Sequence, residues 1–115
     1  MESLKLARLV AGAFESKLGT DVKILKVDEL TTLADYFVIA TGSSTTQVRA
    51  LADEAEFKVE QAGLTAPRRE GKGGDIWILL DCGEVIAHVF TKDAREYYNL
   101  EKLWADAPVI EAEEE

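Results

Sequence analysis

The sequence predicts an α/β protein in which a mixed β-sheet is flanked by helices. Three observations carry this prediction. Residues 3–18 place apolar side chains at helical spacing, residues 44–47 (STTQ) resemble a helix start, and residues 75–90 (DIWILLDCGEVIAHVF) read as a β-hairpin. The expected order is helix, strand, strand, helix, strand, hairpin and helix, which indicates a layered structure.

The first half of the chain contains two helices and two strands in this prediction. The first helix is expected to stop at Gly19, and residues 22–27 (VKILKV) and 35–41 (DYFVIAT) are rich in β-formers. Ser44 is the expected N-cap of the second helix. Gln47, three residues later, would reach back as in a capping box.

The second half is expected to begin after Gly63, where the second helix stops. A short strand around residues 64–69 and a glycine-rich loop then lead into the hairpin. Thr91 or Asp93 would open a last helix, and Pro108 would mark its end. We therefore expect one domain over residues 1–108, followed by an acidic, disordered tail at 109–115.

The hairpin is predicted to turn at Cys82-Gly83, so that Trp77 faces His88 and Asp81 faces Glu84. Side chains alternate across a strand, and each face of the ribbon therefore has its own composition. One face is wholly apolar and is expected in the core: Ile76, Ile78, Leu80, Val85, Ala87 and Val89. The other face mixes rings, aliphatics and charges: Trp77, Leu79, Asp81, Glu84, Ile86, His88 and Phe90.

The charge and composition narrow the function classes. The net charge of −9 disfavours direct binding to a nucleic-acid backbone, which needs a basic surface. An acidic body attracts a basic protein or simply keeps the chain soluble. No apolar run is long enough for a membrane span, no signal peptide is evident, and a single cysteine gives no sign of secretion. The sequence therefore favours a cytoplasmic location.

Residues 41–48 (TGSSTTQV) suggest an alternative function, because a Gly-Ser turn at a helix start can hold an anion. Nucleotidyltransferases use such a turn, with paired carboxylates on a neighbouring strand. No such acid pair follows here, so a well-capped helix start is favoured. Cys82 and His88 lie too far apart for a catalytic dyad, roughly 17 Å along a strand, and no metal-ligand spacing is present. We expect no cofactor and no metal.

The mixed face of the hairpin is the remaining candidate site. Aromatic anchors ringed by acids are typical of interfaces that select basic partners, and Trp77, Asp81, Glu84 and His88 fit that pattern. Residues of the last helix, such as Arg95 or Tyr98, would join them. Alternatively, the last helix simply covers this face. The two interpretations are compatible if the last helix covers the Phe90 end of this face and leaves the Asp81 end exposed.

Four segments together resemble the Iojap or ribosomal silencing factor family: DYFVIATGSS, EG at 70–71, WILLDCGEVIAHVF and REYYNLEKLW. The resemblance implies a fold like that of nucleotidyltransferases without their catalytic carboxylates. It also implies binding to the large ribosomal subunit through the fourteenth protein of that subunit, which has a basic surface. The resemblance further implies that the bound chain occupies the face of the large subunit that meets the small subunit, which blocks subunit joining and lowers translation.

Carried over position by position, the resemblance implies a site on the hairpin and the last helix. Trp77 and Tyr98 would be apolar anchors, Asp81 and Glu84 would face basic groups, and His88 would orient the tryptophan. The full set of expected partner-binding residues is Trp77, Asp81, Glu84, His88, Arg95, Tyr98 and Leu100. An exposed aromatic patch also makes a homodimer of the free chain an expectation.

Overall fold

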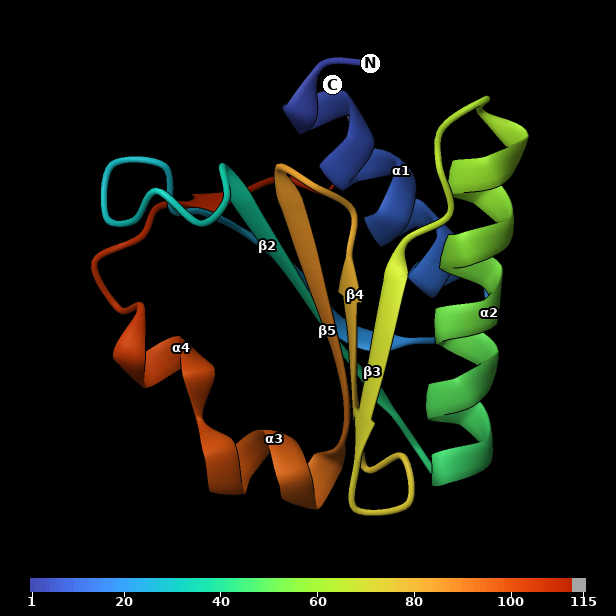
Figure 1. The fold of residues 1–115 in the computed structure, drawn as a ribbon. Helices are drawn as coiled ribbons and strands as arrows, with labels where there is room; N and C mark the ends of the chain where they lie inside the picture. Colours follow the sequence, from blue (N-terminus) through green and yellow to red (C-terminus); the bar gives the residue numbers. More distant parts are fainter. Residues whose placement is uncertain (113–115) are drawn as a thin grey trace.

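The computed structural model describes residues 1–112, in which one six-stranded sheet carries helices on both faces (Figure 1). The predicted α/β class with a mixed sheet is confirmed. The elements in chain order are α1 (Ser3–Ser16), β1 (Thr20–Lys26), β2 (Tyr36–Gly42), α2 (Thr45–Gln61), β3 (Arg68–Lys72), β4 (Trp77–Asp81), β5 (Val85–Thr91), α3 (Lys92–Tyr98), α4 (Leu100–Leu103) and β6 (Val109–Ile110).

The strands lie in the order β3-β4-β5-β2-β1-β6. β2 and β5 pair in parallel at the centre of the sheet, and all other neighbours pair antiparallel. The parallel pair requires a crossover, which α2 supplies as it passes over one face. The short strands β3 and β6 form the two edges of the sheet.

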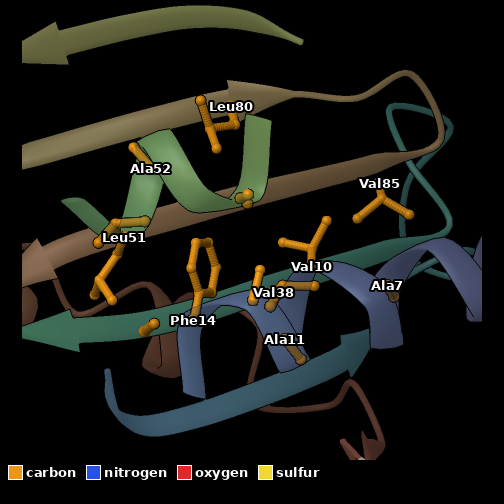
Figure 2. Packing of buried hydrophobic residues seen from close by; sticks show 14 of the residues in the cluster. Ala7, Val10, Ala11, Phe14, Val38, Leu51, Ala52, Leu80 and Val85 are labelled. Atoms are coloured by element: carbon orange, nitrogen blue, oxygen red, sulfur yellow. The ribbon is translucent and has the colours of Figure 1, made fainter. Parts of the chain in front are cut away.

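The face under α1 and α2 holds the larger core. Phe14 of α1 and Leu51 of α2 point toward the sheet, where Val38 and Leu80 meet them (Figure 2). The face of the hairpin that was predicted to be core lies here, and its residues 78, 80, 85, 87 and 89 are fully buried. Only Ile76 departs, because it lies in the turn before β4 and packs on the opposite side.

The opposite face is covered only in part, by α3 and α4 (Figure 1). These two short helices replace the single helix expected after Thr91. Asn99 separates them with a left-handed backbone (φ 45°), a conformation that asparagine adopts more readily than most residues. α3 packs mainly on β5 and β2, so the β3–β4 end of this face carries no helix.

The predicted hairpin register is wrong. Trp77 pairs with Phe90 and Leu79 pairs with His88, because the two-residue loop is Gly83-Glu84 and not Cys82-Gly83. The Cys82 N–H donates to the Val85 carbonyl at 2.9 Å, and Gly83 has φ 88°. Glycine in the first loop position is typical of a type II′ turn. The shift moves each pair by two residues, so the residues within β4 and β5 stay on their predicted faces.

Two predicted boundaries also change. The third strand was expected around residues 64–69, but β3 begins at Arg68, where Arg69 reaches back to Asp53 of α2 at 2.6 Å. Val109 and Ile110 form β6 against β1, so ordered structure continues past the boundary expected at Pro108. Residues 113–115 of the expected acidic tail lie outside the described residues.

The predicted capping box is confirmed at the start of α2. The Ser44 hydroxyl accepts the Gln47 N–H at 3.1 Å. The Gln47 side chain reaches back to the N–H of Ser43, one residue earlier than in the standard box, and donates to the Lys17 and Leu18 carbonyls. Gln47 therefore joins the start of α2 to the end of α1.

Replacing Ser44 by Ala is expected to lower the free energy of unfolding by about 1 kcal/mol, since the Gln47 N–H loses its acceptor. Urea denaturation followed by circular dichroism measures the loss. Ser43→Ala is the matched control, because only the backbone N–H of Ser43 takes part in the cap. Equal losses in both variants would contradict the assignment of Ser44 as the cap.

Candidate functional site: an aromatic face on the β-hairpin

The seven expected site residues do not form one patch. Trp77 and Tyr98 lie together at the base of the hairpin, with His88 buried behind Trp77. Asp81 and Glu84 lie near the hairpin tip, at the far end of β4. Arg95 is buried elsewhere, and Leu100 is half-buried against the core under α3 and α4. Whether any of them touches a partner stays a prediction.

Trp77 is held by a hydrogen bond from inside the protein. Its indole Nε1–H donates to Nδ1 of His88 at 3.2 Å, as the expected orienting role of His88 requires. His88 is only 5% exposed, and burial lowers its pKa from 6.5 to about 4. The imidazole is therefore neutral at neutral pH and keeps Nδ1 free as an acceptor. The two rings do not stack, since their planes are tilted by 41°.

An aromatic cluster surrounds this hydrogen bond. Trp77 contacts Phe90 and Tyr98 at ring-centroid distances of 5.0 and 4.6 Å, and Phe37 meets both His88 and Trp104 edge to face. Such tilted and edge-to-face pairs are the favoured aromatic geometries. The cluster joins β2, β4, β5 and the C-terminal helices into one unit. The Phe90 end of the mixed face is thus covered by the C-terminal helices, as expected.

The uncovered end of the sheet presents a surface that we call the binding face. In β3 and β4, Lys72 lies opposite Trp77, Glu70 opposite Leu79, and Arg68 opposite Asp81. Leu79 is half-exposed and belongs to neither hydrophobic cluster. Two small hollows of about 70 and 90 Å³ lie between these side chains. The binding face consists of Arg68, Glu70, Lys72, Trp77, Leu79 and Asp81.

Sequence reasoning missed the contribution of β3 to this face. Arg68, Glu70 and Lys72 recur at every second residue, which is the signal of one strand face, but they lie in a segment expected to be partly loop. The result is a face of balanced charge: Arg68 lies opposite Asp81, and Lys72 lies beside Glu70. Glu84 is exposed at the hairpin tip, in the loop outside the paired strands.

Asp81 has a structural role in the turn. Its Oδ1 accepts the N–H of Gly83 at 2.9 Å, which helps to fix the type II′ loop. The neighbouring Cys82 thiol is partly buried, and burial together with Asp81 raises its pKa to about 11. The thiol therefore stays protonated at neutral pH, and a nucleophilic role for it has no support.

Arg95 serves as an internal clamp. Its guanidinium donates to Glu101 Oε1 at 2.8 Å, to the Asp21 carbonyl at 2.7 Å and to Thr41 Oγ1 at 2.8 Å. The hydrogen bond from Arg95 lowers the pKa of Glu101, and Lys23 contributes further. Since Arg95 is only 7% exposed, it ties the α3–α4 bend to β1 and β2 rather than facing solvent.

The Gly-Ser turn at residues 41–44 offers little to a nucleotide. The N–H of Ser43 and the hydroxyl of Ser44 are both engaged by Gln47. Within residues 1–112 no group of three or more metal-ligating side chains comes together, and no helix there is long and apolar enough to cross a membrane.

Comparison with known proteins gives the family. The whole chain, residues 1–115, matches the family model described as "Ribosomal silencing factor during starvation". A ribosomal silencing factor RsfS from Halalkalibacterium halodurans is 41% identical over 113 residues, which cover 98% of this chain and 97% of that protein. The chain belongs to the ribosomal silencing factor family.

Two further relatives extend the comparison. A crystal structure of a Chromobacterium violaceum protein superimposes with a TM-score of 0.88 at 36% identity, covering 91% of this chain and 88% of that one. A mouse protein named "Mitochondrial assembly of ribosomal large subunit protein 1" is 31% identical over 87 residues. That match covers 73% of this chain and 38% of the mouse protein.

The stability of the protein is expected to depend on pH through His88, the single histidine. Well above pH 6.5 the imidazole is neutral in both the folded and the unfolded state. As the pH falls from 6.5 toward 4, the unfolded chain binds a proton that the folded chain does not, so the unfolding free energy decreases. The unfolding free energy is expected to change by up to about 1.4 kcal/mol per pH unit in this range. Urea denaturation at several pH values measures it.

His88→Asn is the matched variant for this test, because the amide oxygen can accept from Trp77 but does not titrate. Carboxylates titrate in both proteins, so the difference between the two slopes isolates the histidine. Identical slopes between pH 6.5 and 4 would show that His88 is protonated equally well in the folded and unfolded states.

Proposed function

We propose that this chain represses translation by steric exclusion and catalyses no reaction. It binds the large ribosomal subunit in the cytoplasm through the fourteenth protein of that subunit, as the sequence resemblance implies. The bound chain occupies the surface that the small subunit needs, so the two subunits do not join. Subunit joining is lost whenever that surface is covered, and an interface of ordinary size is sufficient.

Family membership supports the ribosome as the target. The family description names ribosomal silencing during starvation, and the name of the mouse relative refers to the large ribosomal subunit. The partner surface is expected to be basic, because this chain carries a net charge of −9. Electrostatic attraction would speed association with such a surface.

The single observation that carries the site assignment is the fixed indole of Trp77 beside an uncovered strand pair. The ring is half-buried, held from behind by His88, and followed along β4 by half-exposed Leu79. An anchor that is already ordered loses little conformational entropy on binding. Tyr98 supplies a second ring, and Asp81 and Glu84 extend the site toward the hairpin tip. A homodimer of the free chain would use the same face and would compete with the ribosome.

The mechanism is tested by sedimentation of purified subunits. Adding the chain to large subunits before small subunits are supplied is expected to lower the amount of joined ribosomes. The chain should travel with the large subunit, and excess small subunits should compete with it. Normal joining at saturating occupancy of the large subunit would contradict steric exclusion.

Trp77→Ala is expected to weaken binding to large subunits by about 30-fold or more, because a hot-spot anchor typically contributes about 2 kcal/mol or more. Cosedimentation at several chain concentrations measures the affinity. Trp104→Ala is the matched control. It removes the same type of side chain from the Phe37 side of the cluster, away from the binding face. If both folded variants bind equally well, Trp77 is not the anchor.

Glu84→Lys is expected to slow association and to weaken binding several-fold, since it places like charge at the tip near a basic partner. Glu84 suits this test better than Asp81, whose carboxylate fixes the turn. Glu15→Lys, at an exposed position of α1 on the other face of the sheet, changes the net charge equally. Association rates at low and moderate salt distinguish the two. Equal effects would mean that only overall charge matters.

A further inference from the structure

The ammonium group of Lys72 lies over the ring of Trp77, the proposed anchor. The rings of Trp77 and Tyr98, from β4 and α3, meet at 47° with their centroids 4.6 Å apart and form a two-walled corner. The Lys72 ammonium lies 5.2 Å from the Trp77 ring centroid and 6.0 Å from that of Tyr98. Both distances fall within the range of a cation–π contact.

The position of Lys72 follows from the sheet. It lies directly opposite Trp77 in the β3–β4 register, and paired residues project from the same face. Within residues 1–112 Lys72 makes no ion pair, so the rings are its main partners. An exposed cation–π contact favours the docked position only by a factor of about two to five. A second cation can therefore compete for the corner.

We propose that the Trp77–Tyr98 corner is a cation subsite, filled by Lys72 in the free chain and by an arginine or lysine side chain of the ribosomal protein in the complex. This inference rests on the proposed function and specifies its chemistry. Glu70 lines the same hollow as Lys72, Trp77 and Leu79, and its carboxylate favours a cation there. Lys72 is thus an internal competitor, and docking displaces it.

The first test compares affinities for the large subunit. Lys72→Ala empties the corner and is expected to bind about two- to fivefold more tightly. Lys72→Arg keeps a cation on the rings and is expected to lack the gain in affinity that Lys72→Ala shows. Lys5→Ala, at an exposed position of α1, removes the same charge from the other face of the sheet and should leave the affinity unchanged. Weaker or unchanged binding of Lys72→Ala would overturn the proposal, because Lys72 would then contact the partner itself or have no influence.

The second test needs no ribosome. N-acetyl-arginine methylamide is titrated into each variant, and the Nε1–H resonance of Trp77 is followed by NMR. Lys72→Ala is expected to bind this probe several-fold more tightly than the native chain, and the neutral citrulline analogue should cause no comparable shift. Equal shifts with both probes, or equal affinity in both proteins, would overturn the cation subsite.

The two tests separate the subsite from the function. If arginine binds the opened corner but the chain never binds large subunits, the proposed function fails and the subsite stands. If large subunits bind the chain while Lys72→Ala changes neither readout, the subsite fails and the function stands.

Discussion

The hydrogen bond from the Trp77 indole to His88 is the interaction on which the rest of the site depends. It lies at the centre of an aromatic cluster, where the indole N–H and His88 Nδ1 satisfy each other, while His88 Nε2 is also buried and has no hydrogen-bond partner among the described residues. The neutral state of His88, which burial enforces, keeps Nδ1 available as the acceptor. The indole is thereby fixed at the boundary between covered and uncovered sheet. Without that bond, only packing against Phe90 and Tyr98 would orient the Trp77 ring.

The architecture around this bond explains why only one end of the sheet face is open. α3 and α4 are short, and the left-handed residue Asn99 bends the chain between them. Arg95 then clamps the bend to Asp21 and Glu101, so the two helices stay over β5 and β2. α1 and α2 cover the opposite face of the sheet, and the larger hydrophobic core lies between these helices and the sheet. At the β3–β4 end, one face of the sheet is therefore packed against helices and the other face carries no helix. This arrangement suits a rigid docking surface.

Sequence reasoning predicted the faces of the hairpin correctly although it assigned the wrong register. The alternation of Ile78 and Leu80 with Trp77 and Leu79 depends only on a period of two, and a shift by two residues preserves it. The turn itself was misplaced, because Gly83 supports either loop position and only the bond from Cys82 to Val85 decides. The clamp by Arg95 could not be predicted, since Asp21 and Thr41 lie 74 and 54 residues away in the chain. β3 was misplaced for a similar reason: its polar sequence becomes a strand through pairing with β4.

The central claim is that the open β3–β4 end of the sheet contacts a basic protein of the large subunit. Site-specific photo-crosslinking tests it most directly. A benzophenone amino acid at Leu79, in the middle of the binding face, is compared with one at exposed Phe57 on α2. Crosslinks from position 79 to one basic protein of the large subunit, with none from position 57, are the predicted result. The reverse pattern would contradict the account, because the chain would then bind ribosomes through its helical side.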